Sequence, residues 1–371
     1  MNLEDNEVLT RVGPGTPMGE VMRRYWWPIW FSENVTTKPV PVRLLGEDLV
    51  LFRGSDGELG LTERYCAHRR ASLQYGRVEP NGIRCCYHGW LFDRSGRCLE
   101  TPMEPDGSTL KNDVSIAAYK TQEVCGLIFA YLGPDPAPVL PPYDLLHFKS
   151  AVSDIGAEEE HCNWLQRAEN LVDQYHLTVL HASVYPDMAL KRPYAEWERT
   201  WYGIRIRSSV SGRAQAKISH FIFPSENRFT RARIGDIPSH RLRYRVPVDD
   251  TKTHTFFVHS WPNDSGQLEL RNKGLLERER LEHKPIDDGW WGIPSDDQDR
   301  VAQESQGLIT DRSREYLGTT DRGIVMLRQM LHESIENVRK GEDPIGIIRD
   351  PSAFNVIDLD ASMDEIGALT G

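Results

Sequence analysis

The sequence has no long hydrophobic run, few cysteines and no excess of positive charge. No stretch approaches about 18 consecutive apolar residues, and the N-terminal MNLEDNEVLT is acidic, so neither a membrane span nor a secretory signal peptide is expected. Six cysteines in 371 residues do not make a disulfide framework, and their clustering favours a metal site in a reducing cytoplasm. The formal net charge of −11 disfavours nucleic acid as a partner.

The chain is long enough for two domains, and its pattern changes near residue 145. From about Val40 to Leu132, short apolar runs alternate with turn pairs such as Asp56-Gly57 and Asn81-Gly82, which predicts a small antiparallel β domain. A segment with five prolines, GPDPAPVLPPY, follows and predicts a linker. We therefore expect an α+β protein with one domain over residues 1–145, including a short helix over 16–25, and another over 146–371.

The second domain mixes helical and strand-like sequence. Helices are predicted around 160–182, 297–317 and 322–340, and strands over 200–210, 217–223, 240–248 and 253–261. On the predicted strands, arginines alternate at Arg205 and Arg207 and at Arg241, Arg243 and Arg245. Guanidinium groups suit carboxylates, so these rows are either the charged outer faces of strands or part of an anion pocket.

Two Cys/His pairs lie in the β domain. Cys66-Ala-His68 is followed, after 16 intervening residues, by Cys85-Cys86-Tyr-His88. Two thiolates and two imidazoles suit one tetrahedral zinc, and they equally suit a [2Fe–2S] cluster with cysteines on one iron and histidines on the other. We expect Cys86 to be a small apolar side chain that fills space in the interior and binds no metal.

A second constellation lies in NWLQRAENLVDQYHLTVLH. Asn170, Asp173 and His176 are spaced by threes, and His181 follows five residues later. On a regular helix, His176 and His181 would point roughly 140° apart, so they can share a metal only if the helix breaks or carries a π-bulge. Two imidazoles and one carboxylate suit iron with open coordination positions.

The carboxylate must come from elsewhere in the chain. The acidic run SDDQDRVAQESQG offers Asp296, Asp297, Asp299 and Glu304. Acidic residues at a helix N-terminus are also favoured by the helix dipole, which is the simpler explanation for some of them.

The motifs resemble those of a known family. C-x-H and C-x-x-H, closed by YHGW, are similar to a Rieske domain, although Arg70 stands where that family usually has glycine. N-x-x-D-x-x-H-x4-H and Gln298-Asp299-Arg300-Val301 resemble Rieske non-haem iron oxygenases. The resemblance implies a [2Fe–2S] cluster and a mononuclear Fe(II), with these residues: Cys66, Cys85, His68 and His88 on the cluster; His176, His181 and Asp299 on the iron; Asp173 as a bridge between imidazoles; Asn170 as a polar group near the iron.

Three longer segments resemble the phthalate dioxygenase branch of the aromatic ring-hydroxylating oxygenases. They are LTRVGPGTPMGEVMRRYWWP, VPVDDTKTHTFF and QESQGLITDRSREYLGTTD. The resemblance implies a terminal oxygenase alpha subunit in aromatic catabolism, with a helix-grip-type catalytic domain, an antiparallel sheet flanked by helices. It also implies electrons from NAD(P)H through a separate reductase, with or without a ferredoxin, and a head-to-tail trimer or dimer of trimers.

The expected reaction uses O2 to hydroxylate or dihydroxylate a small aromatic substrate, with a carboxylated one as our guess. A Rieske monooxygenase acting as an O- or N-demethylase is the alternative, and a Rieske electron carrier without oxygenase activity is a more distant one. The stretch VGPG is a poor match to a nucleotide-binding fingerprint, which agrees with a separate reductase.

Overall fold

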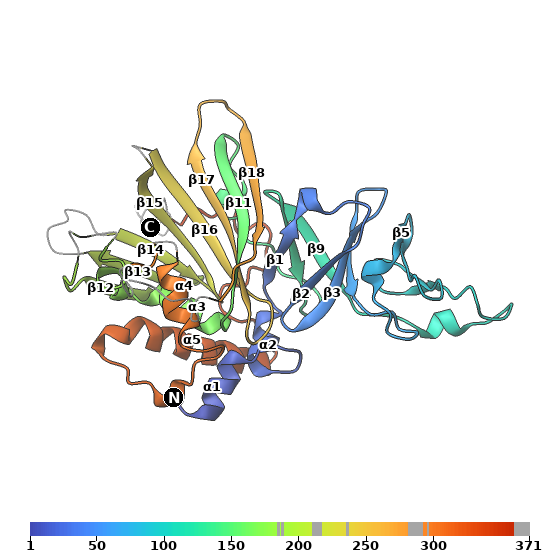
Figure 1. Ribbon diagram of the computed structural model, residues 1–371, viewed down its shortest axis with the longest axis horizontal. Helices are drawn as coiled ribbons and strands as arrows, with labels where there is room; N and C mark the ends of the chain where they lie inside the picture. Colours follow the sequence, from blue (N-terminus) through green and yellow to red (C-terminus); the bar gives the residue numbers. More distant parts are fainter. Residues whose placement is uncertain are drawn as a thin grey trace. The chain divides into compact units, whose positions relative to one another are not determined.

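The computed structural model describes residues 1–359 apart from 184–185, 187–188, 210–216, 235–236, 281–291 and 295–296. The chain divides into two compact units (Figure 1). The smaller unit is Arg23–Ala137, and the larger combines Met1–Met22 with the described residues from Pro138 onward. No helix in the described part of the chain is long and apolar enough to cross a membrane.

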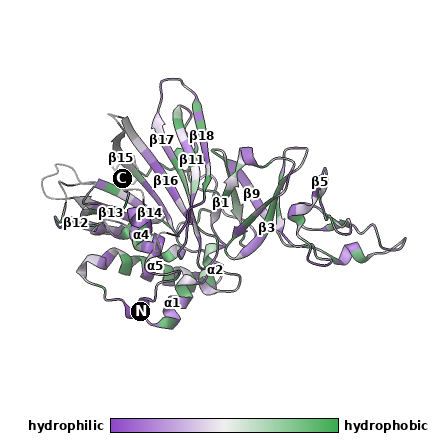
Figure 2. Cartoon of the chain, viewed as in Figure 1, coloured by the Kyte–Doolittle hydropathy of each residue, from purple (hydrophilic) through white to green (hydrophobic). Residues whose placement is uncertain are grey.

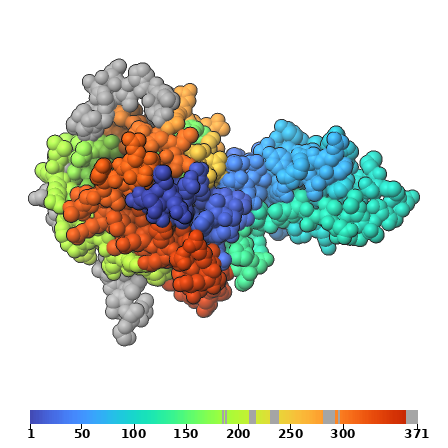
Figure 3. All heavy atoms as spheres, turned by 90° about the horizontal axis from the view of Figure 1, so that it is seen from below, coloured from blue at the N-terminus to red at the C-terminus, as the bar shows by residue number. Residues whose placement is uncertain are grey.

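The N-terminal helices belong to the larger unit, whereas the sequence analysis placed them in the first domain. Helix α1 (Leu3–Thr10) contacts α3 (Trp164–Val172), and α2 (Pro17–Met22) contacts α5 (Arg322–Arg339). Leu9, Met18 and Val21 are fully buried, so these short helices are held by apolar packing. Figure 3 shows the dark blue N-terminal residues lying against the orange C-terminal ones. The division between Ala137 and Pro138 falls inside the proline-rich segment expected to be a linker.

The smaller unit is an antiparallel β domain, as expected. Its six-stranded sheet has the order β1 (Trp26–Phe31), β10 (Leu127–Tyr131), β9 (Ala118–Val124), β4 (Leu59–Glu63), β3 (Glu47–Arg53) and β2 (Val40–Leu44). A four-stranded sheet contains β5 (Arg77–Glu79), β6 (Gly82–Arg84), β7 (Leu91–Phe92) and β8 (Cys98–Glu100). The β2–β3 hairpin turns at Leu45 and Gly46, both with positive φ (50° and 78°), the geometry of a tight two-residue turn.

The larger unit contains an eight-stranded sheet. Its order is β12 (Tyr194–Arg199), β13 (Gly203–Ser209), β14 (Lys217–Ile222), β15 (Glu226–Ile234), β16 (Ile237–Pro247), β17 (Thr253–Pro262), β11 (Ala151–Glu160) and β18 (Leu268–Leu276). All neighbours are antiparallel except β11 and β18. Strand β18 contains both hydrophilic and hydrophobic residues, with a polar run in its middle (Figure 2). The four expected strands correspond to β13, β14, β16 and β17, and the sequence analysis missed the other four.

Helices α3, α4 (Gln298–Glu304) and α5 flank this sheet, so the α+β class is confirmed (Figure 1). Three contacts tie the end of α3 and the segment after it to the sheet: Trp197 Nε1 donates to Val172 O (2.8 Å), Ser208 Oγ donates to Gln174 Oε1 (3.0 Å), and Arg167 lies 2.7 Å from Glu160. The helix expected over 297–317 ends at Glu304, because Gly307 adopts a positive φ of 92°.

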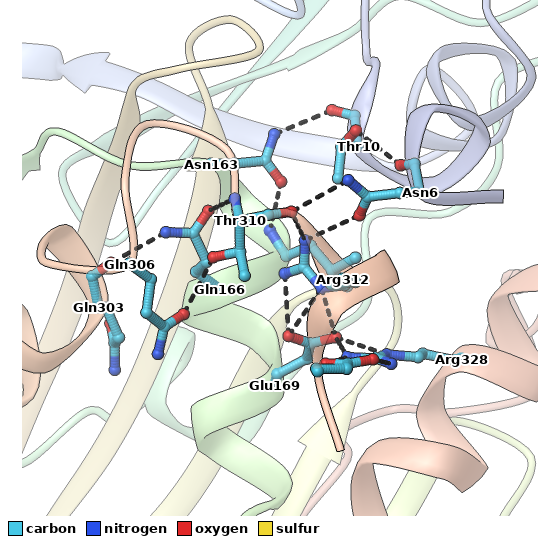
Figure 4. Close-up of polar contacts among 12 residues, drawn as sticks. Asn6, Thr10, Asn163, Gln166, Glu169, Gln303, Gln306, Thr310, Arg312 and Arg328 are labelled. Carbon is cyan, nitrogen blue, oxygen red and sulfur yellow. Dashed lines mark hydrogen bonds and ion pairs between the residues drawn. The ribbon is translucent and has the colours of Figure 1, made fainter. Parts of the chain in front are cut away.

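An ion network ties α3 to α1 and α5 (Figure 4). The Glu169 carboxylate accepts hydrogen bonds from Arg312 Nη2 (2.9 Å) and Arg328 Nε (2.7 Å), and Arg312 Nη1 also donates to Asn6 Oδ1 (3.2 Å). The Arg312 side chain is fully buried. A buried guanidinium is stable only with its charge paired, so Glu169 sets the position of α3 relative to both other helices.

We expect Glu169→Ala to lower the free energy of unfolding by about 3–5 kcal/mol, since it leaves two arginines without their shared carboxylate. Urea unfolding followed by circular dichroism measures this. Glu333→Ala is the matched control, because its pair with Arg199 is about half exposed and is worth less than about 1 kcal/mol. Equal losses in the two variants would show that the buried network does not hold α3.

Candidate metal centres

Two loops in the smaller unit carry the four Cys/His residues, and the loops share one backbone design. Arg70 N–H donates to Cys66 O (2.9 Å) and Cys66 N–H donates to Ala71 O (2.9 Å). In the second loop, Gly89 N–H donates to Cys85 O (3.1 Å) and Cys85 N–H donates to Trp90 O (2.8 Å). Each cysteine therefore opens a closed turn, and its histidine follows within that turn.

The fourth residue after each cysteine has a left-handed backbone. Gly89 has φ +74° and Arg70 has φ +59°. Arginine there costs roughly 1–2 kcal/mol that glycine avoids, yet the loop keeps the same shape. The Arg70 guanidinium forms an ion pair with Glu63 and lies 5.2 Å from the centre of the Tyr65 ring. The departure from the family pattern thus leaves the loop geometry intact.

The thiols and the imidazoles form two close pairs. Cys66 and Cys85 are buried, and burial followed by the nearby Cys85 raises the pKa of the Cys66 thiol to about 12. The His68 and His88 ring centres are 4.5 Å apart. Two thiols in one pair and two imidazoles in the other match the donor set of a two-iron cluster with cysteines on one iron and histidines on the other.

Trp90 and Cys86 are the two other side chains of interest in these loops. The Trp90 ring stacks on His68 at 4.6 Å with an interplanar angle of 4°, which fixes the orientation of that imidazole. Cys86 is exposed, so the expectation that it fills apolar space is wrong. Its neighbour Cys85 is buried, so the two adjacent cysteines have different surroundings.

The second constellation lies where α3 ends. Helix α3 stops at Val172, Asp173 has an extended backbone (φ −84°, ψ 122°), and His176 opens a 3₁₀ turn, His176–Thr178. Helix α3 therefore ends before His176, and both histidines lie beyond it instead of on one helix with a break between them. The His176 and His181 ring centres lie 5.4 Å apart.

Asp299 completes the group, and it enters from α4. Its Oδ1 atom is 3.3 Å from His181 Nε2 and 3.5 Å from His176 Nε2, and the three donor atoms lie within 4.8 Å of one another. Burial raises the pKa of the Asp299 carboxyl, but the neighbouring His181 and His176 outweigh it and hold that pKa well below its ordinary range.

The other acids of this run have different surroundings. Asp297 pairs with Arg278 (2.7 Å), and Glu304 is fully buried and accepts from His161 N–H (3.1 Å). Asp296 lies outside the described residues. Asp299 is thus the acid of the run that the structure brings to the two histidines.

Asn170 and Asp173 both lie beside this group. Asn170 Nδ2 donates to Asp299 Oδ1 (3.3 Å). Asp173 Oδ2 is 3.3 Å from His176 Nδ1, and its Oδ1 accepts from Tyr175 N–H (2.8 Å). Burial raises the pKa of Asp173, but His176 outweighs it and the net shift is downward. The sequence analysis gave no role to Gln298, whose Oε1 lies 2.8 Å from His181 Nδ1.

Side-chain contacts hold α3 and α4 together. Gln166 Nε2 donates to Gln303 O (2.9 Å), and Arg167 donates to the Gln303 side chain. One turn further along α3, Asn170 reaches Asp299. Figure 4 shows Gln166 extending from α3 toward Gln303. These contacts place Asp299 opposite the end of α3.

The three donors fit a metal ion. Their Nε2 and Oδ1 atoms converge, and such electron pairs repel unless a cation lies between them. Two imidazoles and one carboxylate form the facial set typical of ferrous iron with open positions. The side chains of His176 and Asp299 keep 16% and 37% of their exposure, so small molecules can reach the group.

The arginine rows lie on opposite faces of the sheet. Arg205 donates to Glu198 (3.0 Å) and, like Arg207, points away from the face on which Ser208 contacts the Gln174 side chain. On β16, Arg245 lies opposite Thr255, whose hydroxyl donates to Glu160 (2.9 Å), the partner of Arg167. Arg241, Arg243 and Arg245 therefore lie on the face of the sheet that carries α3. Arg205 and Arg207 lie on the other face, as expected for the charged outer face of a strand.

Comparisons with known proteins agree with this geometry. The family described as Rieske [2Fe-2S] domain matches residues 25–120. The 5,5'-dehydrodivanillate O-demethylase oxygenase subunit of Sphingobium sp. is 38% identical, covering 97% of this chain and 86% of that protein. The phthalate 4,5-dioxygenase oxygenase subunit of Pseudomonas putida is 33% identical over 92% of this chain and 88% of that protein.

Solved structures show the same fold. NdmA of Pseudomonas putida CBB5, determined with caffeine, has a TM-score of 0.71 at 20% identity, covering 91% of this chain and 99% of that one. Three observations agree: two Cys/His loops on a β domain, two histidines on the segment that follows the end of α3, and relatives matched over nearly the whole chain. The chain belongs to the Rieske non-haem iron oxygenases, as an oxygenase subunit with a Rieske [2Fe–2S] domain.

Proposed function

We propose that this protein is the terminal oxygenase of a multicomponent system, with His176, His181 and Asp299 holding a mononuclear Fe(II) ion. The observation that supports this most directly is the convergence of these three donors, which needs both the break after Val172 and the entry of α4. Cys66, Cys85, His68 and His88 would hold the cluster. When bound, the cluster supplies single electrons and the ferrous ion supplies open positions for dioxygen.

The residues around the iron site position its ligands. Asp173, 3.3 Å from His176 Nδ1, orients that imidazole and raises its basicity. Its carboxylate is about a quarter exposed (26%), so it can also accept a hydrogen bond from a second imidazole. Asn170 donates to Asp299 and restricts how that carboxylate turns. Electrons would come from NAD(P)H through a separate reductase, with or without a ferredoxin, which agrees with relatives named as oxygenase subunits.

The purified enzyme should contain about three irons per chain, two in the cluster and one in the mononuclear site. His176→Ala and Asp299→Ala should each lower this to about two and leave the EPR signal of the reduced cluster unchanged. Asp297→Ala, in the same acidic run, is the control and should keep about three. Two irons in the unmodified protein would indicate an electron carrier instead, and zinc without the EPR signal would indicate a structural metal site.

We propose that the active assembly is a head-to-tail ring of subunits, a trimer or a dimer of trimers, in which the cluster of one subunit serves the iron of the next. His68 is exposed and Asp173 keeps an accessible carboxylate, so each presents a polar group to a second copy. A heterologous contact of this kind closes into a ring.

Coexpression of two inactive variants tests the ring. Cys66→Ser removes the cluster and His176→Ala removes the iron. Randomly mixed rings should regain about a quarter of the unmodified activity, because about one contact in four then pairs an intact cluster with an intact iron. Light scattering gives the subunit number. If electrons pass only within a chain, the mixed rings will be as inactive as either parent.

We propose an aromatic carboxylate as substrate. Both relatives described above carry the name of an aromatic acid. On the α3 face of the sheet, Arg245 is buried, and burial followed by the charges of Arg167 and Arg243 lowers its pKa to about 9, so it stays cationic at neutral pH. Arg243 lies beside His259 (3.1 Å), which stacks on Phe257 (4.6 Å). This cationic and aromatic surface favours a flat anion.

A panel of benzoates, phthalates and methoxybenzoates, assayed with a surrogate reductase for O2 uptake and products, tests the substrate class. Arg243→Ala should raise KM for the best acid roughly 10- to 100-fold, the worth of a charge-assisted hydrogen bond, with a smaller change in kcat. Arg207→Ala, on the opposite face, should change neither. Turnover of uncharged aromatics alone would contradict the proposal, and the product separates dihydroxylation from O-demethylation.

A further inference from the structure

Gln298 lies beside the ligand group without being part of it. It is the first residue of α4, immediately before Asp299, and its side chain is fully buried. Its Oε1 atom is 2.8 Å from His181 Nδ1, and its Nε2 donates to Ser183 Oγ (3.0 Å) and Ile293 O (3.3 Å). All three polar contacts of the amide are therefore made by groups around the broken helix and the start of α4.

The Ile293 carbonyl decides which way the amide faces. A carbonyl oxygen only accepts, so the amide atom that faces it must be the NH2 group. The amide oxygen then faces His181 Nδ1, and because that oxygen only accepts, Nδ1 must carry the hydrogen. In a neutral imidazole the other nitrogen is then unprotonated. His181 Nε2 thus presents its lone pair toward Asp299 Oδ1, 3.3 Å away.

The two histidines differ in the group behind them. His176 Nδ1 faces the carboxylate of Asp173 at 3.3 Å, whereas His181 Nδ1 faces a neutral amide. A carboxylate behind an imidazole raises its basicity, and an amide orients it without adding charge. The site is thus electrostatically asymmetric, with one charged and one neutral supporting group.

We propose that Gln298 is a positioning residue for the iron site: it fixes the tautomer and ring orientation of His181 so that Nε2 is available as a ligand. This rests on the proposed iron site. Because Gln298 and Asp299 are consecutive, the first turn of α4 supplies one ligand and orients another. A shift of α4 would therefore displace both together.

The test measures the affinity of the iron-free mononuclear site for Fe(II), by competition with a chelator, in protein whose cluster is intact. Gln298→Met, similar in size but unable to accept, should weaken Fe(II) binding roughly 10- to 100-fold. Gln298→Asn, one methylene shorter, should lose nearly as much because it does not reach His181. Gln298→Glu keeps an acceptor and should stay within about threefold of the unmodified protein.

Ser183→Ala is the matched control, because it removes one partner of the amide and leaves the Ile293 and His181 contacts; it should change the affinity less than about threefold. The absorption bands of bound Co(II) report the ligand field and should shift in Gln298→Met but not in Ser183→Ala. Cluster EPR and the unfolding midpoint check that each variant is folded.

Two results would overturn the role of Gln298: Fe(II) affinity in Gln298→Met and Gln298→Asn within about threefold of the unmodified protein, or Gln298→Glu as weak as Gln298→Met. The second result would mean that an acceptor at this position is not what iron binding requires. If the unmodified protein itself binds no third iron, the proposed function fails, and that failure is distinct from a variant that binds iron as well as its parent.

Discussion

The end of α3 at Val172 is the constraint on which the second site depends. On a continuous helix, His176 and His181 would diverge by roughly 140°, and no metal could take both. The break leaves carbonyl groups without helical partners, and Trp197 supplies one by donating its indole N–H to Val172 O (2.8 Å). Gly323 lies against the same carbonyl, where an added Cβ would come within 2.4 Å of that oxygen. Trp197 on β12 therefore satisfies the Val172 carbonyl at the end of α3, and Gly323 on α5 leaves room for it.

The two sites are built in different ways. In the smaller unit, each cysteine opens a turn that is closed by its own backbone hydrogen bonds within five residues, so the ligand geometry is local. In the larger unit, Asp299 meets His176 and His181 only because side chains of α3 hold α4, and because Glu169 holds α3 to α1 and α5. Loss of a contact between α3 and α4 should therefore affect the geometry of His176, His181 and Asp299 before it affects the Cys/His loops.

This difference explains what the sequence could predict. The Cys/His spacing and the need for a helix break between His176 and His181 follow from local patterns. The choice of Asp299 follows from the family resemblance, and the structure brings Asp299 to the two histidines. The end of α4 at Glu304 does not follow from the predicted helix over 297–317, which continues past Gly307. The polar residues of β11, β12, β15 and β18 obscure the alternation that predicts a strand. Helices α1 and α2 bury Leu9, Met18 and Val21, and they contact α3 and α5, which lie far along the chain. Local sequence patterns do not predict such contacts. The role of Gln298 can be inferred only from its side-chain contacts. The faces on which the two arginine rows lie can be inferred only from the strand register.

The start of α4 concentrates these dependencies. Gln298 contacts His181, Asp299 contacts both histidines and Asn170, and Gln303, one turn later, contacts Gln166 and Arg167. A short helix has little stability of its own, so its position must come from such contacts. Residues at both ends of α4 contact α3 or the segment after it. The packing of these two helices therefore sets the geometry of His176, His181 and Asp299. The sheet then carries that pair of helices through the contacts of Arg167, Val172 and Gln174.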